Sequence, residues 1–154
     1  MLKINDKVPN FEILTDQGKF KISDYTGKNI VIFFFPKADT SGCTKESIAF
    51  TNLQKEFDQL NCVVIGISKD DPKKQGKFRQ KHNLTCELGA DFENNVCEQF
   101  GVWVEKSMYG RKYMGIQRAT FLSNEQGIIT NVWEKVKVPG HAEDVLEAVK
   151  RINK

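Results

Sequence analysis

The sequence lacks several patterns that would assign the chain to familiar classes. Its apolar runs are far shorter than the ~20 residues needed to cross a bilayer, so we expect no membrane partner. Residues 1–6 show no apolar core and no small-residue cleavage site, so we expect no signal peptide and a cytoplasmic location. The net charge is only +3, without a basic block rich in aromatics, which argues against nucleic acid as a partner.

Cysteine pairs of the Cys-x-x-Cys type are also missing. The four cysteines are widely spaced: Cys43, Cys62, Cys86 and Cys97. This spacing argues against a zinc site and against a dithiol oxidoreductase, and we expect neither a metal nor a cofactor. In a reducing compartment all four would be thiols.

Internal repeats, low-complexity segments and linkers are absent as well. The 154 residues are long enough for one complete core and short for two. A hydrophobic content of 40% and a charged content of 28% are ordinary for a globular protein. We therefore expect a single domain over residues 1–154.

The most informative stretch that is present spans residues 30–46. Six apolar residues, 30–35, predict a buried central strand, which Pro36 ends and a polar turn follows. A helix is predicted from Cys43 to about Leu60. Spacings of seven place Cys43, Phe50 and Phe57 on one buried stripe of this helix.

The position of Cys43 has chemical consequences. In the first turn of a helix, unpaired backbone N–H groups and the positive end of the helix dipole favour a thiolate over a thiol. Thr40, Ser41 and Thr44 can cap this turn or donate a hydroxyl to the sulfur. The alternative is a buried cysteine that acts as a small apolar residue. The surrounding polar turn favours a reactive cysteine.

The remaining elements predict a mixed sheet covered by helices, an α/β class. A second apolar strand over 62–68 completes a βαβ unit, which implies parallel pairing and a right-handed crossover. Cys62 begins this strand, where we expect it to pack. The other expected elements are an N-terminal β-hairpin (11–14 and 20–22), a helix over 72–82, a strand over 85–88, a helix opened by 91–95, a loop over 105–115, a hairpin (116–123 and 128–133) and a terminal helix ending near 152.

The pattern Pro36-x-x-x-Thr40-x-x-Cys43 on a strand-to-helix turn, followed by Arg118-Ala119-Thr120-Phe121-Leu122, resembles the peroxiredoxins. Further stretches are similar to the Q-type branch, also called bacterioferritin comigratory proteins. These are residues 101–103, 106–110, 113–116 and 135–141. The similarity extends from about Val8 to Val149.

The resemblance implies a thioredoxin-like fold and a thiol peroxidase that reduces hydrogen peroxide and organic hydroperoxides in antioxidant defence. It implies that Cys43 is the peroxidatic cysteine and Thr40 its hydroxyl partner. Pro36 would shield the pocket, and Arg118 would be the cation beside thiolate and peroxide. Glu46, one helical turn after Cys43, would hold the arginine in place.

The sequence departs from much of this branch at the resolving cysteine. The usual position, five residues after the peroxidatic cysteine, is Ile48, and a second position falls near Arg79. Cys86 and Cys97 remain as candidates, but their apolar surroundings indicate core positions. We therefore expect a one-cysteine cycle with an external thiol, such as thioredoxin, glutaredoxin or a low-molecular-weight thiol. The resemblance also favours a monomer.

Two alternatives belong to other functional classes. The missing resolving cysteine is compatible with a peroxide-sensing or chaperone-like binding protein in which Cys43 oxidises without turnover. A cysteine phosphatase would need an arginine six residues after the nucleophile, and that position is Ala49. We exclude the phosphatase on this ground.

Overall fold

A seven-stranded mixed sheet forms the centre of the computed structural model, which describes residues 1–152. The strand order is β2-β1-β5-β4-β3-β8-β9. Strands β3, β4 and β5 are parallel, whereas β1, β2, β8 and β9 pair antiparallel. The strands are β1 (Glu12–Thr15), β2 (Gly18–Lys21), β3 (Asn29–Phe34), β4 (Cys62–Ser68), β5 (Glu87–Ala90), β8 (Ala119–Ser123) and β9 (Ile129–Trp133).

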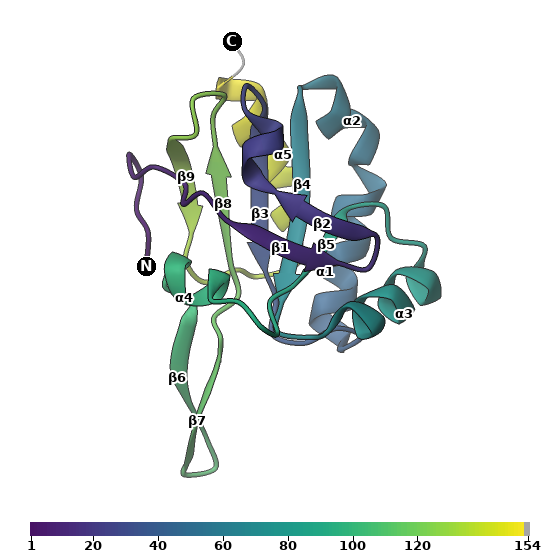
Figure 1. Ribbon diagram of the computed structural model, residues 1–154, viewed down its shortest axis with the longest axis vertical. Helices are drawn as coiled ribbons and strands as arrows, with labels where there is room; N and C mark the ends of the chain where they lie inside the picture. Colours follow the sequence, from purple (N-terminus) through teal and green to yellow (C-terminus); the bar gives the residue numbers. More distant parts are fainter. Residues whose placement is uncertain (153–154) are drawn as a thin grey trace.

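The helices connect and cover these strands (Figure 1). They are η1 (Ile22–Tyr25), α1 (Ser41–Asn52), α2 (Gln54–Gln59), α3 (Pro72–His82), α4 (Val96–Phe100) and α5 (His141–Ile152). The predicted βαβ unit, the N-terminal hairpin and the α/β class are confirmed. No helix within residues 1–152 is both long enough and apolar enough to cross a membrane.

Strand β3 is buried on both faces, as its unbroken apolar run predicts. Val31 and Phe33 belong to one core cluster, together with Cys43 and Phe50 of α1 and with apolar residues of α5. Ile32 and Phe34 belong to the second cluster on the opposite face, with Phe100 of α4. The strand therefore leads into the Cys43 turn from a position that is packed on both faces.

The single helix expected from Cys43 to Leu60 is wrong in one detail. It divides at Leu53, whose backbone is not helical and whose N–H donates to the Phe50 carbonyl at 3.1 Å. This tighter turn still places Phe57 against Phe50, with ring centroids 5.9 Å apart. The interruption therefore keeps both aromatic rings in the same core.

The helix expected from the 91–95 segment begins later. It starts at Val96, because the Asp91 carboxylate accepts the backbone N–H groups of Val96 and Cys97 at 3.1 and 2.8 Å. The strand expected over 85–88 lies at Glu87–Ala90, and the strand expected from 116 begins at Ala119. These shifts leave the order of elements unchanged.

The loop expected over 105–115 is wrong. These residues form a separate two-stranded hairpin, β6 (Trp103–Met108) and β7 (Arg111–Ile116), which extends beyond the rest of the molecule in Figure 1. Tyr109 and Gly110 form its turn with φ of 51° and 77°, the two left-handed residues of a type I′ turn. Because most of the hairpin packs on no core, it shows no alternation of apolar and polar residues.

Candidate active site

The N-terminal turn of α1 brings three of the predicted site residues together. Cys43 is the third residue of α1 and is fully buried. Its Sγ accepts a hydrogen bond from Nη2 of Arg118 at 3.3 Å. Nη1 of the same guanidinium donates to Oε1 of Glu46 at 2.7 Å. One arginine thus joins the thiol and the carboxylate.

Gly42 gives the guanidinium room for this approach, and its role was not predicted from the sequence. A Cβ at this position would lie 3.1 Å from Nη2 of Arg118. A contact of this length is tighter than ordinary van der Waals packing, so a side chain would push the guanidinium away by a few tenths of an ångström. Because Gly42 has no side chain, Arg118 has room to reach Cys43.

Glu46 holds the arginine from inside the protein. Its side chain is 1% exposed and that of Arg118 is 18% exposed. Burial raises the pKa of Glu46 to about 7, although the Arg118 guanidinium acts in the opposite direction. Its Oε2 accepts no hydrogen bond from any residue in the described range. The pKa of Glu46 therefore depends on how close the Arg118 guanidinium lies.

The loop that precedes Cys43 is fixed from both sides. The backbone N–H of Ala38 donates to Oδ2 of Asp70 at 2.7 Å, and Ser68 donates to the same oxygen. Asp39 pairs with Lys81 and His82 at 2.8 Å each. Pro36, at the start of this loop, is half-buried. These long-range contacts from the loop after β4 and from α3 could not be found from the local sequence.

The hydroxyl bond expected between Thr40 and Cys43 is not among the contacts within residues 1–152. The Thr40 hydroxyl donates instead to the Lys37 carbonyl at 2.8 Å, and its side chain is exposed. The Thr44 hydroxyl donates to the Thr40 carbonyl at 2.7 Å. A role for Thr40 toward a bound peroxide stays a prediction.

Two further residues lie around the site without having been singled out for it. Lys106 of β6 is half-buried, and its pKa is lowered by burial and by the charge of Arg118, while Cys43 acts in the opposite direction. His141 of α5 is 4% exposed and bonds Thr120 at 2.8 Å. Burial lowers the pKa of His141 to about 4. Lys106 and His141 are brought near Cys43 only by the tertiary fold.

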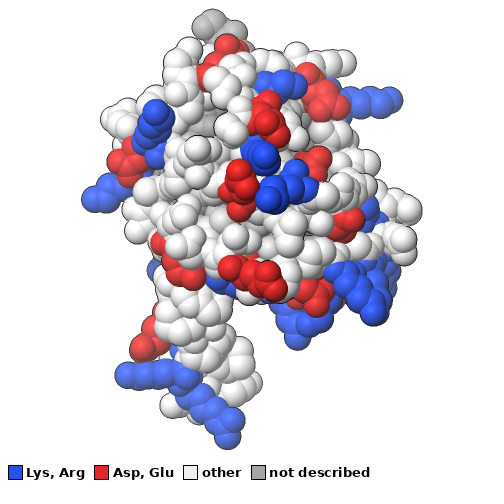
Figure 2. All heavy atoms as spheres, in the orientation of Figure 1, with Lys and Arg blue, Asp and Glu red and all other residues white. Residues whose placement is uncertain are grey.

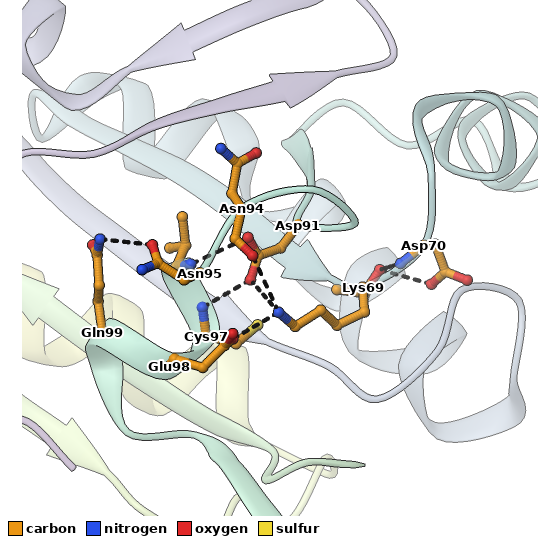
Figure 3. Close-up of polar contacts among 10 residues, drawn as sticks. Lys69, Asp70, Asp91, Asn94, Asn95, Cys97, Glu98 and Gln99 are labelled. Carbon is orange, nitrogen blue, oxygen red and sulfur yellow. Dashed lines mark hydrogen bonds and ion pairs between the residues drawn. The ribbon is translucent and has the colours of Figure 1, made fainter. Parts of the chain in front are cut away.

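The other three cysteines lie in different environments. All four thiols are free and buried. Burial raises the pKa values of Cys62 and Cys86 to about 12. Burial also raises the pKa of Cys97, and the nearby Asp91 carboxylate raises it further. Figure 3 shows Cys97 beside Asp91, which accepts its backbone N–H. These surroundings keep the thiols protonated and support the expected core positions.

Comparisons with known proteins show which family this chain belongs to. The AhpC/TSA family pattern matches residues 4–132. A putative peroxiredoxin Bcp of Coxiella burnetii is 44% identical over 94% of this chain and 97% of its own. Peroxiredoxin Bcp of Bacillus subtilis is 43% identical over 97% of this chain and 96% of its own.

The chain belongs to the AhpC/TSA family and is a peroxiredoxin of the Bcp type.

Solved structures show the same fold. The bacterioferritin comigratory protein of Xanthomonas campestris superposes with a TM-score of 0.92 at 34% identity, covering 99% of this chain and 100% of its own. A cysteine-to-serine variant of peroxiredoxin Q from Xylella fastidiosa gives 0.94 at 34% identity, covering 100% and 99%. The predicted thioredoxin-like peroxiredoxin fold is confirmed.

Membership of this family makes the chain a thiol-dependent peroxidase, which uses a peroxide substrate and a thiol reductant. It favours the enzyme over the peroxide-sensing or chaperone-like alternative. Within residues 1–152, no cluster of three or more His, Cys, Asp or Glu side chains is arranged to hold a metal ion.

Proposed function

We propose that Cys43 is the peroxidatic cysteine and that hydrogen peroxide and small organic hydroperoxides are its substrates. The observation that carries this proposal is the single guanidinium of Arg118, bonded to Cys43 Sγ at 3.3 Å and to Glu46 at 2.7 Å. The similar Xanthomonas campestris protein is described with alkyl peroxide reduction activity. That activity motivates the organic hydroperoxides as substrates here.

The first step is a nucleophilic displacement at oxygen. The Cys43 thiolate attacks one peroxide oxygen, a sulfur–oxygen bond forms and the oxygen–oxygen bond breaks. The sulfur loses two electrons and becomes a sulfenic acid, and the departing oxygen takes up a proton to leave as water or an alcohol. Arg118 stabilises the negative charge that moves from sulfur to the departing oxygen.

Stabilising a thiolate is not sufficient by itself for a fast reaction. Lowering a thiol pKa from ~8.5 to ~6 raises the thiolate fraction at neutral pH about thirtyfold. The accompanying loss of nucleophilicity, with a Brønsted slope of ~0.4–0.5, gives back roughly tenfold. Most of the acceleration must therefore come from groups that orient the peroxide, the role we assign to Arg118, with Glu46 as its positioning residue and Pro36 as a shield.

The second half of the cycle needs a thiol from outside the chain. We infer a one-cysteine cycle, because Cys86 and Cys97 are buried thiols with raised pKa values. An external thiol, from thioredoxin, glutaredoxin or a small molecule, attacks the Cys43 sulfenic acid and expels water. A second thiol then breaks the mixed disulfide and restores Cys43.

We further infer a single domain over residues 1–154 that acts as a monomer in the cytoplasm. The sheet with its two cores runs through one continuous stretch of chain. Four free thiols fit a reducing compartment. Sedimentation velocity across a range of protein concentrations tests the monomer.

The experiment that tests the proposed function is intact mass spectrometry after one equivalent of hydrogen peroxide, with and without a sulfenic acid trapping agent. We expect one adduct at Cys43 and no loss of two hydrogens. A disulfide that disappears in Cys86→Ser or Cys97→Ser would overturn the one-cysteine cycle. An adduct that persists in Cys43→Ser would overturn the assignment of the nucleophile.

A further inference from the structure

The β6–β7 hairpin carries an unusual share of the exposed apolar surface. Eight large apolar side chains are exposed among residues 1–152, and four of them lie on this hairpin: Met108 at 56%, Tyr109 at 100%, Tyr113 at 44% and Met114 at 48%. Exposed apolar side chains that cluster in this way mark interaction sites. Tyrosine, methionine and arginine are also the residue types enriched in protein interfaces.

The turn geometry does not explain the most exposed of these residues. Tyr109 stands at the first left-handed position of the turn, with φ of 51°. Asparagine, aspartate and glycine are the residues that favour this position. A fully exposed tyrosine there therefore adds apolar contact area without helping the hairpin to form.

The hairpin is also basic. Between Trp103 and Ile116 the sequence contains Lys106, Arg111 and Lys112 but only one acid, Glu105. Glu105 already pairs with Lys112 at 3.8 Å. Figure 2 shows the hairpin projecting from the molecule, with uncharged side chains over most of this face and lysine and arginine along one side and at the tip. Its surface is therefore apolar with a positive rim.

The base of the hairpin adjoins the Cys43 site. Strand β7 ends at Ile116, two residues before Arg118. Lys106 is within electrostatic reach of both Cys43 and Arg118. Lys106 pairs with Tyr113 across the hairpin, and the side chains of both lie over Gly115. The hairpin surface thus begins beside the site of the buried Cys43 and extends to the exposed turn.

We propose that the β6–β7 hairpin is the docking surface for a protein thiol reductant whose contact surface is apolar around its reactive cysteine and acidic at its rim. The proposal rests on the proposed function, since it names the partner that reduces the Cys43 sulfenic acid. It accounts for the exposed methionines and tyrosines as the contact area and for the cations as the groups that guide the partner.

The dimensions favour a protein over the substrate as the occupant. Lys106 and Tyr109 are three positions apart in the sequence, and at ~3.3 Å per residue the turn lies about 10 Å beyond Lys106. A small hydroperoxide at Cys43 cannot contact both ends. A protein surface that buries ~800 Å² per partner can. A second copy of the chain would bring two hairpins of the same net charge together, which opposes pairing.

The test uses the variant Met108→Thr/Tyr109→Asn/Met114→Thr. Threonine keeps the strand preference, and asparagine favours the turn, so the hairpin is retained while its apolar surface is lost. Lys106 and Tyr113 stay unchanged because they adjoin the site. The matched control, Ile4→Thr/Phe92→Asn, removes exposed apolar side chains elsewhere, at 55% and 40% exposure.

Two steps are measured separately by stopped flow. The first is oxidation of Cys43 by hydrogen peroxide without reductant. The second is reduction of the oxidised protein by thioredoxin, by glutaredoxin and by dithiothreitol. We expect the hairpin variant to lose about tenfold or more in the rate constant with the protein reductant that serves the wild type. Its rates with hydrogen peroxide and dithiothreitol should stay within about twofold of wild type and control.

The charge is tested with Arg111→Gln/Lys112→Gln. In the wild type the rate with the protein reductant should fall as salt is added, because screening shortens the range of charge attraction. In this variant the salt dependence should be weaker, and the rate with dithiothreitol unchanged. Equal salt dependence in both proteins would overturn the acidic rim.

Other results overturn the proposal in distinguishable ways. If neither thioredoxin nor glutaredoxin reduces wild type faster than dithiothreitol, no protein reductant docks here. A loss confined to oxidation by cumene hydroperoxide would assign the surface to the substrate. If the hairpin variant differed from wild type only in sedimentation, the surface would be assigned to contact with a second copy of the chain. If it differed only in binding to anionic phosphatidylglycerol vesicles, the surface would be assigned to contact with a membrane. Failure of the first step in wild type would instead overturn the proposed function.

Discussion

Cys43 and Cys97 are both fully buried, and each lies in the first turn of a helix. They differ in the charge that faces them. The guanidinium of Arg118 bonds the sulfur of Cys43 at 3.3 Å, whereas a buried carboxylate, Asp91, lies beside Cys97 and raises its pKa. At an effective dielectric constant of 20, unit charges ~4 Å apart interact by about 4 kcal/mol. The charge of the neighbouring side chain therefore has a larger effect on the stability of a thiolate than a position in the first turn of a helix has.

The largest effect is expected from Cys43→Ser. We expect peroxide consumption to fall to the uncatalysed level, because serine does not form a nucleophilic anion at neutral pH. The matched control is Cys97→Ser, which should consume peroxide at the wild-type rate per folded molecule. The measurement is peroxide consumption with excess dithiothreitol. A similar loss in both variants would remove the distinction between the two thiols.

Arg118→Ala tests the cation that distinguishes the two sites. Removal of one group that stabilises transition-state charge costs about 10²–10³-fold in rate, and we expect this loss in the rate constant of Cys43 oxidation. Arg118→Lys keeps the charge but cannot bond Cys43 and Glu46 from one planar fork, so its rate should be intermediate. Arg111→Ala on the hairpin is the control. A wild-type oxidation rate in Arg118→Ala would contradict this role.

Asp91→Asn tests the carboxylate that lies beside Cys97. Asp91 accepts two backbone N–H groups and pairs with Lys69 at 3.2 Å (Figure 3). We expect a loss of about 2 kcal/mol in the free energy of unfolding, since an asparagine amide can accept only one of the two buried backbone N–H groups and leaves the other unsatisfied.

Urea unfolding measures this loss, with Glu98→Gln as the matched control. Glu98 pairs with the same lysine at 2.6 Å but is 43% exposed, so its loss should cost less than about 1 kcal/mol. Equal costs for Asp91→Asn and Glu98→Gln would show that burial of the carboxylate is unimportant. The oxidation rate of Cys43 should not change in either variant.

The smallest effect is a pH dependence from the two buried titratable groups around the Cys43 site. The pKa of Glu46 is raised from 4.5 to about 7, so the folded state binds more protons in this window and stability falls as pH rises. The pKa of His141 is lowered from 6.5 to about 4, so the unfolded state binds more protons and stability rises with pH. The two slopes oppose each other in the wild type.

Single substitutions should separate these slopes. Glu46→Gln should leave stability that rises with pH through the His141 window, and His141→Asn should leave stability that falls with pH through the Glu46 window. One proton gives at most about 1.4 kcal/mol per pH unit. Urea unfolding at pH 4.5, 5.5, 6.5 and 7.5 measures both. If stability changed with pH in the same way in wild type and in both variants, the assignment of the pH dependence to Glu46 and His141 would be contradicted.

Local sequence predicted the elements whose residues are constrained by burial. The unbroken apolar run of β3 and the seven-residue spacing from Cys43 to Phe57 each indicate packing against a core. The strand is present, and the predicted helix is present as α1 and α2, divided at Leu53. The projecting hairpin was missed for the same reason. Most of its length touches no core, and its turn is Tyr109–Gly110 rather than the favoured Asn-Gly.

By itself, the sequence determined the α/β class, the turn that places Cys43 at a helix N-terminus and, through its resemblance to the peroxiredoxins, the identity of Arg118 and Glu46 as its partners. Only the tertiary structure decided the rest. It brought the guanidinium against Gly42, tied the preceding loop to Asp70, and set Asp91 beside Cys97. Local patterns record which residues are buried, whereas reactivity depends on charges brought close from distant parts of the chain.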